Sequence, residues 1–158
     1  MNWMKKVAVA LVCLLPLGLQ AAKVDTLQVK SPSMNKSIEV VVVSPDVAAT
    51  KACPVIYLLH GYGGNARTWV GIKPDLSKIA DEKGIFFVCP DGKNTWYWDS
   101  PLNADVRYET FISDELVKYV DSHYKTVADR KGRAITGLSM GGHGAMWNGL
   151  RHSDVFSA

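Results

Sequence analysis

The residues with the clearest chemical potential are Gly137-Leu138-Ser139-Met140-Gly141, which spell the pattern G-x-S-x-G. This pattern places a serine on a sharp turn between a strand and a helix, where small neighbours are needed because the backbone is crowded. The hydroxyl then stands clear of the sheet at a helix N-terminus, where free N–H groups favour negative charge. Ser139 is therefore the predicted catalytic nucleophile for acyl transfer, and the alternative is a tight helix start without chemistry.

A second motif, His60-Gly61-Tyr62-Gly63-Gly64, follows a buried apolar run. Attack on an acyl carbon creates an oxyanion, which is usually stabilised by two backbone N–H donors. One donor comes from the residue after the serine, Met140, and the other from the earlier glycine loop, with Tyr62 as first choice and Gly61 as second. We also predict that His60 and Gly61 contact substrate, with His60 ordering its own loop; the alternative is a plain glycine-rich turn.

The general base is harder to find among the four histidines. His143 lies one turn beyond Ser139 on the expected helix, so its side chain should point away from the hydroxyl, and His123 and His152 lie at helix ends. In this motif class the acid and the histidine follow the serine in chain order. We therefore expect both partners beyond Ala158, and Asp91 in Pro-Asp-Gly is more simply a turn residue.

Three aromatic residues, Trp96-Tyr97-Trp98, stand together in a polar segment that is expected to be a loop. Pockets prefer aromatic linings, so these rings could form the floor of an acyl or sugar subsite, with Trp98 as the named candidate. They could equally cap the hydrophobic core, and the sequence leaves both interpretations open.

The apolar patterns predict an α/β fold in which a β-hairpin is followed by alternating strands and helices. The expected strands are 24–30, 37–44, 55–59, 85–89 and 133–138, and the expected helices are 74–84, 108–124 and 140–150. This order predicts a mostly parallel sheet with helices on both faces. His60, Asp91 and Ser139 each follow the carboxyl end of a strand, the edge of such a sheet at which ligands bind.

Residues 1–21 are expected to lie outside this domain, which spans residues 22–158. A basic start at Lys5 and Lys6, an apolar run and small residues before Lys23 are typical of a signal peptide, and the run is shorter than a membrane span needs. We therefore expect an exported protein, periplasmic or secreted, without a stable membrane anchor.

Composition limits the function classes further. The formal net charge is only +3, without a Lys/Arg cluster, which argues against a nucleic-acid partner. Cys53 precedes one buried strand and Cys89 closes the next, so parallel pairing would separate the thiols by roughly 15 Å, beyond the ~7 Å that a disulfide allows. Both cysteines are predicted to be small core residues.

The segments 57–65, 96–101, 115–121 and 137–145 together resemble the esterase D family, which includes S-formylglutathione hydrolases, feruloyl and acetyl xylan esterases, and mycolyltransferases. The resemblance implies an α/β-hydrolase fold that stops after the nucleophile strand and helix, a serine nucleophile at Ser139, and backbone donors at Tyr62 and Met140. It also implies an acid and a histidine in the C-terminal part of the family's domain.

The resemblance implies a serine carboxylesterase that removes acyl groups from small-molecule or polysaccharide esters, and the exported context favours the carbohydrate branch. The chemistry needs no metal or organic cofactor. An acyltransferase of the mycolyltransferase type and a carbohydrate-binding relative without activity remain alternatives, and the sequence does not define the oligomeric state.

Overall fold

The computed structural model describes residues 22–158, and the predicted signal peptide lies outside the described residues. The strands are β1 (Lys23–Ser31), β2 (Lys36–Ser44), β3 (Val55–Leu59), β4 (Phe86–Pro90) and β5 (Arg133–Gly137). The helices are α1 (Thr68–Ile72), α2 (Leu76–Lys83), α3 (Tyr108–Thr110), α4 (Leu116–His123) and α5 (Met140–Arg151), with short 3-10 turns at Asp46–Ala49 and Arg130–Gly132. No helix in this described part is long and apolar enough to cross a membrane.

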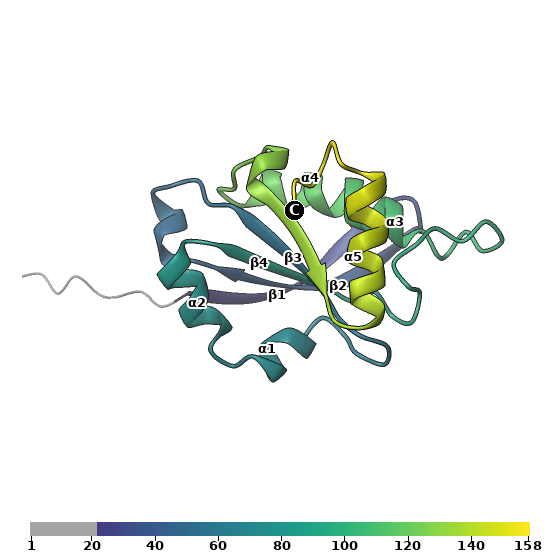
Figure 1. The fold of residues 1–158 in the computed structure, drawn as a ribbon, viewed down its shortest axis with the longest axis horizontal. Coiled ribbons are helices and arrows are strands. Elements are labelled where there is room, and N and C mark those ends of the chain that lie inside the picture. The colour runs from purple at the N-terminus through teal and green to yellow at the C-terminus, as the bar shows by residue number, and fades with distance from the viewer. Residues whose placement is uncertain (1–21) are drawn as a thin grey trace, which may run out of the picture.

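The five strands form one mixed sheet in the order β1-β2-β4-β3-β5 (Figure 1). The hairpin β1–β2 is antiparallel and continues antiparallel onto β4, whereas β4, β3 and β5 run parallel to one another. Strand β3 therefore lies between β4 and β5, and its carboxyl end has a parallel strand end on each side. This arrangement confirms the predicted order of elements.

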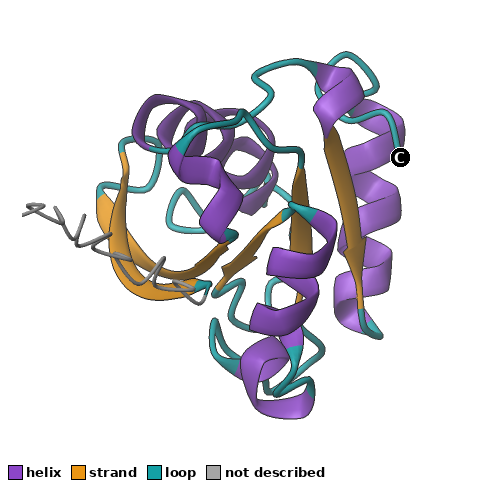
Figure 2. Cartoon of the chain, turned by 90° about the vertical axis from the view of Figure 1, so that its left-hand side faces the viewer, coloured by secondary structure: helices purple, strands orange, loops and turns teal. Residues whose placement is uncertain are grey.

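Helices cover both faces of the sheet (Figures 1 and 2). Side chains alternate along each central strand, so Tyr57 and Leu59 enter the core beneath α4 and α5, while Leu58 enters the core beneath α1 and α2. Successive side chains of a strand point to opposite faces of the sheet. Because helices cover both faces here, both faces of β2, β3 and β4 are apolar. The prediction of an α/β-hydrolase sheet with helices on both faces is confirmed.

The predicted helix over residues 108–124 is present but is not uniform. It consists of α3, a π turn at Phe111–Glu115 and α4, with helical backbone angles at the junctions. In the π turn Ser113 is buried and its hydroxyl donates to Asn148 Oδ1 on α5 at 2.7 Å. Helix α2 begins at Leu76, after Asp75, rather than at Pro74, and ends as expected where Gly84 takes a left-handed conformation.

Cys53 and Cys89 are both free and buried, as predicted. The parallel register pairs Tyr57 with Val88, which leaves the two cysteines at opposite ends of their strands. Burial raises the pKa of the Cys89 thiol to about 12, so this side chain remains a neutral core group at physiological pH.

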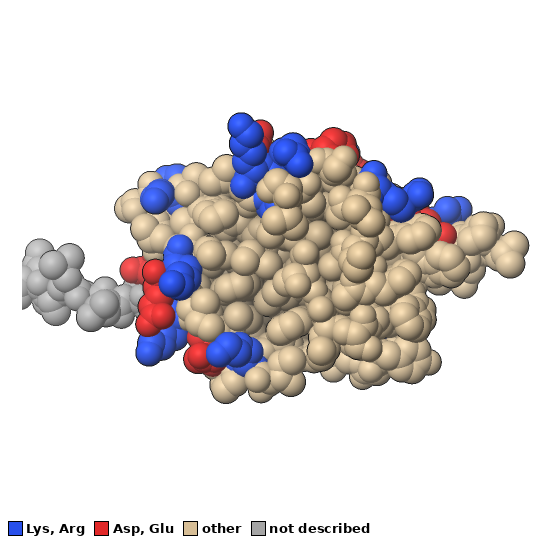
Figure 3. Space-filling view, viewed as in Figure 1, with Lys and Arg blue, Asp and Glu red and all other residues tan. Residues whose placement is uncertain are grey.

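One face of the molecule is poor in charge. Figure 3 shows few Lys, Arg, Asp or Glu side chains over the middle of the view in which β5 and α5 lie in front. A groove of about 600 Å³ runs between β5 and α5, and Met146 and Leu150 are strongly exposed beside it. The last residues begin to pair with β5 along this groove, since Ser157 N–H donates to the Arg133 carbonyl at 3.1 Å and Ile135 N–H to the Ala158 carbonyl at 2.8 Å.

We expect a polypeptide of residues 22–158 alone to self-associate, because a sheet edge and an apolar helix face lie side by side. Size-exclusion chromatography should show aggregates or broad peaks, and replacing Met146 and Leu150 together by lysine should shift material toward the monomer. Lys78→Met on α2, which covers the other face of the sheet, is the control and should not increase the amount of monomer. A monomeric peak for the unmodified polypeptide, with a sharp cooperative melt, would contradict this expectation.

Candidate functional site

Ser139 occupies the corner between β5 and α5 with its side chain exposed. Its backbone angles are φ 54° and ψ −114°, a conformation that non-glycine residues adopt rarely. Strain of this kind persists only where the surroundings enforce it, and it is common at functional sites. The predicted sharp turn is therefore present, and it projects the serine away from the sheet.

Two glycines allow this corner to form. A Cβ added at Gly137 would lie 2.3 Å from backbone atoms of Gly141, and one added at Gly141 would lie 2.2 Å from the Leu59 carbonyl oxygen. The same carbonyl accepts a hydrogen bond from Leu138 N–H at 3.1 Å. The first turn of α5 thus packs directly against the end of β3, and only glycine fits at these two contacts.

The glycine loop after β3 lies against the serine. A Cβ built on Gly61 would stand 3.6 Å from Ser139 Cβ and 3.3 Å from the Leu138 carbonyl oxygen. Among residues 22–158, neither the Tyr62 N–H nor the Met140 N–H donates to a protein acceptor. The two residues that carry these N–H groups differ in exposure. Met140 is buried, whereas Tyr62 is 68% exposed.

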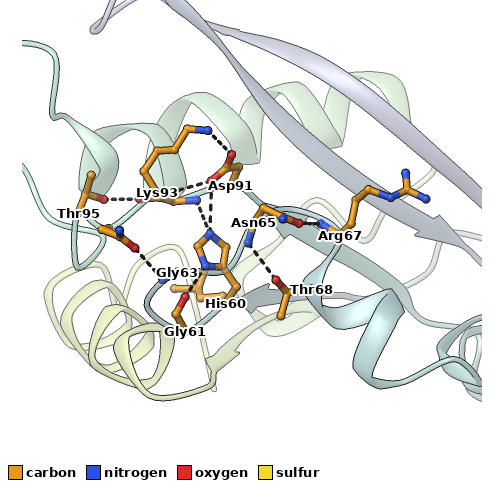
Figure 4. Close-up of polar contacts among 12 residues, drawn as sticks. His60, Gly61, Gly63, Asn65, Arg67, Thr68, Asp91, Lys93 and Thr95 are labelled. Atoms are coloured by element: carbon orange, nitrogen blue, oxygen red, sulfur yellow. Dashed lines mark hydrogen bonds and ion pairs between the residues drawn. The ribbon is translucent and has the colours of Figure 1, made fainter.

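His60 lies beneath this loop and is 1% exposed (Figure 4). Its Nδ1 is 2.7 Å from the Gly61 carbonyl oxygen, and its Nε2 is 3.0 Å from the Gly92 nitrogen. Because both ring nitrogens are occupied and the ring is enclosed, the predicted contact between this side chain and substrate finds no support in the geometry. The second predicted role, that of ordering the loop, fits these contacts.

Asp91 lies at the end of β4 and adjoins His60, with 3.5 Å between Asp91 Oδ1 and His60 Nε2. It accepts hydrogen bonds from Lys93 N–H at 2.9 Å and from Lys93 Nζ at 2.6 Å (Figure 4). Burial opposes ionisation of this carboxyl, but the hydrogen bonds from Lys93 and the charge of its ammonium group outweigh it and hold the pKa of Asp91 well below its usual range. Asp91 is therefore a charged turn residue that organises the loop after β4.

The loops after β3 and β4 are joined at a second point. Gly63 N–H donates to Asn94 Oδ1 at 2.7 Å, and Gly63 itself has a positive φ of 78°. Asn94 was not among the predicted site residues, and its only signal in the sequence is its place in a polar turn after a buried strand.

The aromatic residues of the second loop separate into two roles. Tyr97 is fully buried, and its hydroxyl donates to the His60 carbonyl at 3.1 Å, so it belongs to the core. Trp96 and Trp98 are 46% and 43% exposed. Trp96 packs edge-on against His143, one helical turn from Ser139, whereas Trp98 packs against Trp147, a further turn away. Trp96 is therefore nearer to the serine along α5 than the predicted Trp98.

A buried carboxylate, Glu109, was missed by the sequence analysis. It accepts hydrogen bonds from Trp147 Nε1 at 2.7 Å, Arg151 Nε at 2.7 Å and His152 Nε2 at 2.9 Å. Burial alone would raise the pKa of Glu109, but these three donors lower it below its usual range. The cluster ties α3 to the C-terminal half of α5.

No base for the serine is found within residues 22–158. Of the four histidines, none is hydrogen-bonded to Ser139 Oγ; His143 Nδ1 instead contacts the Trp96 carbonyl oxygen at 3.1 Å, pointing away as predicted. The same residues contain no group of three or more His, Cys, Asp or Glu side chains that could hold a metal ion. The described part therefore supplies an exposed serine and free N–H donors, without a proton acceptor.

Comparison with known proteins agrees with this geometry. Residues 31–158 match the family model named Esterase, described as "Putative esterase". The chain is 31% identical over 102 residues to an acetyl esterase of Caldicellulosiruptor saccharolyticus, a match covering 64% of this chain and 37% of that protein. It is 34% identical over 113 residues to an endo-1,4-beta-xylanase/feruloyl esterase of Xylanibacter ruminicola, covering 65% of this chain and 15% of that protein.

A solved structure of a ferulic acid esterase superposes with a TM-score of 0.74 at 33% identity, over 87% of this chain and 58% of the other. The chain thus spans little more than half of that structure, and less of the two relatives.

The contact between Gly141 and Leu59 predicts a position-specific effect of alanine. Gly141→Ala should lower the free energy of unfolding by about 2 kcal/mol or more, because the methyl group meets rigid backbone. Gly149→Ala on the same helix is the matched control, since its Cβ would lie 3.5 Å from Ile135 Cγ2 and alanine favours helices. Equal losses in urea denaturation of the whole protein would refute the contact.

The depressed pKa of Asp91 predicts a dependence of stability on pH. A carboxyl with a lowered pKa in the folded state stabilises it above its unfolded pKa of about 3.9, and this contribution disappears as the pH falls through the folded pKa. Asp91→Asn should therefore cost about 2 kcal/mol at pH 7 and progressively less below about pH 4. Thermal melts across this range test it, with exposed Asp154→Asn as control; a pH-independent difference would contradict it.

Proposed function

This chain belongs to the esterase family whose model it matches, and we propose that the whole protein hydrolyses carboxylic esters with Ser139 as nucleophile. The observation that carries the proposal is the exposed hydroxyl of a residue with φ 54° at a strand-to-helix corner, directly against the Gly61 loop. A structural serine at a helix start has no need of this backbone conformation.

In the proposed reaction, Ser139 Oγ attacks the ester carbonyl carbon while its proton passes to a histidine that residues 22–158 do not supply. The carbonyl oxygen becomes an oxyanion, which accepts hydrogen bonds from the N–H groups of Tyr62 and Met140. Collapse of the tetrahedral intermediate expels the alcohol, protonated by the same histidine, and leaves an acyl-serine. Water then attacks this ester and releases the carboxylic acid.

The N–H donors are suited to this task because they are fixed before the reaction begins. The Met140 N–H belongs to the first residue of α5, where the helix dipole adds positive potential. The Tyr62 N–H belongs to a loop that lies against Ser139 and is hydrogen-bonded to the loop after β4. Donors held in advance stabilise developing charge without reorganisation.

We propose acyl esters of carbohydrate as the substrate class. Two relatives are named acetyl esterase and endo-1,4-beta-xylanase/feruloyl esterase, and a similar solved structure is a ferulic acid esterase. Trp96 and Trp98 expose rings close to α5 and could pack against a sugar or a phenolic acyl group. Such polymeric substrates lie outside the cell, which agrees with export directed by the proposed signal peptide in residues 1–21.

Replacement of Ser139 by alanine tests the proposal. In the whole protein, Ser139→Ala should lower kcat for an acetylated or feruloylated sugar by about 10⁴-fold or more, with little change in stability. A fluorophosphonate probe should label the unmodified protein and not the variant. The exposed Ser153→Ala is the matched control and should keep both activity and labelling.

Labelling that persists in Ser139→Ala, or an unmodified protein that neither labels nor hydrolyses any ester, would contradict the proposal. Product analysis with an added sugar or lipid alcohol separates hydrolysis from acyl transfer, since only a transferase gives a new ester.

A further inference from the structure

The peptide bond between Gly61 and Tyr62 connects the glycine loop to the proposed oxyanion donor. Residues 22–158 contain only trans peptides, in which the carbonyl of one residue and the N–H of the next point in opposite directions. Any contact that holds the Gly61 carbonyl therefore also sets the direction of the Tyr62 N–H.

Two donors hold that carbonyl on the inner side of the loop. His60 Nδ1 lies 2.7 Å from the Gly61 oxygen, and Gly64 N–H donates to the same oxygen at 3.0 Å. The Tyr62 N–H is consequently directed to the outer side. The Tyr62 side chain is exposed, and Gly61 lies against Ser139.

The partners of the imidazole define its protonation pattern. The Gly61 carbonyl can only accept, so Nδ1 carries the hydrogen; the Gly92 N–H can only donate, so Nε2 accepts it at 3.0 Å. Both conditions hold in one form of the ring, the neutral Nδ1–H tautomer. Asp91 Oδ1 also faces Nε2, but at 3.5 Å it is farther away than the Gly92 nitrogen, and this carboxylate accepts its hydrogen bonds from Lys93 instead. The ring is further fixed by an edge-on contact with Tyr97, whose hydroxyl donates to the His60 carbonyl.

We propose that His60 is a positioning residue for the oxyanion hole: Gly92 N–H selects the Nδ1–H tautomer of His60, which holds the Gly61 carbonyl inward and thereby points the Tyr62 N–H toward Ser139. Figure 4 shows the contact between the His60 ring and Gly61. The proposal rests on the proposed function, because it assigns to this ring a part in stabilising the oxyanion. If the His60 ring served only to fill the core, either ring nitrogen could carry the hydrogen without affecting the site.

Two amide substitutions separate these cases in the whole protein. The amide nitrogen of asparagine is as many bonds from Cα as His60 Nδ1, so His60→Asn can still donate to the Gly61 carbonyl. The amide of glutamine corresponds to Nε2, so His60→Gln keeps the contact with Gly92 and loses the contact with Gly61. Both substitutions remove the ring and its packing against Tyr97.

Steady-state kinetics on the whole protein should show a loss of kcat of roughly 10-fold to 100-fold for His60→Gln, with KM unchanged, because a misdirected donor weakens only transition-state binding. His60→Asn should stay within about 3-fold of the unmodified kcat, since its side chain still donates to the Gly61 carbonyl and the Tyr62 N–H keeps its direction. His123→Gln, an exposed histidine at the end of α4, is the matched control and should change neither constant.

Equal losses in the asparagine and glutamine variants, or a loss confined to KM, would overturn the proposal. Nitrogen NMR of the unmodified protein gives a second measurement that does not depend on either variant folding: His60 should show a protonated Nδ1 and an unprotonated Nε2 at neutral pH. The opposite tautomer would also overturn the proposal. If the unmodified protein shows no esterase activity and no labelling of Ser139, the proposed function fails, whereas the NMR result still reports the state of the ring.

Discussion

The close approach of backbones at the carboxyl end of β3 is the constraint on which the site depends. The Leu59 carbonyl oxygen accepts hydrogen bonds from Leu138 N–H and from Trp69 Nε1, both at 3.1 Å, and the Cα of Gly141 packs against it. A side chain larger than hydrogen at position 141 would push α5 outward. The left-handed backbone of Ser139 follows from this contact, because the chain must reverse within one residue to enter α5 so near to β3.

The central position of β3 explains why three loops meet. With β4 on one side and β5 on the other, the loop at residues 60–64 touches both neighbouring loops. It contacts Ser139 through Gly61, the Asp91–Lys93 turn through His60, and Asn94 through Gly63. A strand at the edge of the sheet could have offered only one of these contacts. The order of strands thus determines which residues can act together.

Much of this arrangement is readable in the sequence, because it depends on local pattern. The run Val55–Leu59 ends at His60-Gly61 and was predicted to the residue, and the G-x-S-x-G motif located the corner at Ser139. The amphipathic helix after Tyr108 was also found from its spacing. In each case the signal lies within a few residues of the feature that it predicts.

The features that were missed depend on distant partners. His60 is buried because Gly92 and Tyr97, 32 and 37 residues further on, surround its ring and carbonyl, and no local pattern shows this. Glu109 is buried for the same reason, since two of its donors lie on α5 and the third, His152, directly follows that helix. Trp96 and Tyr97 both adopt positive φ values, 57° and 59°, which sequence preference would not assign to aromatic residues, so the division of the Trp-Tyr-Trp segment required coordinates.

Tyr97 is enclosed by glycines from two separate elements. A Cβ at Gly92 would come within 2.0 Å of the ring, and one at Gly144 within 2.5 Å. The three positions are therefore one evolutionary unit: a lineage that acquires a side chain at 92 or 144 must first give up the tyrosine, and one that keeps the tyrosine retains both glycines. The order of substitution is thereby fixed, because a smaller residue at position 97 has to open the space before a side chain at 92 or 144 can enter it.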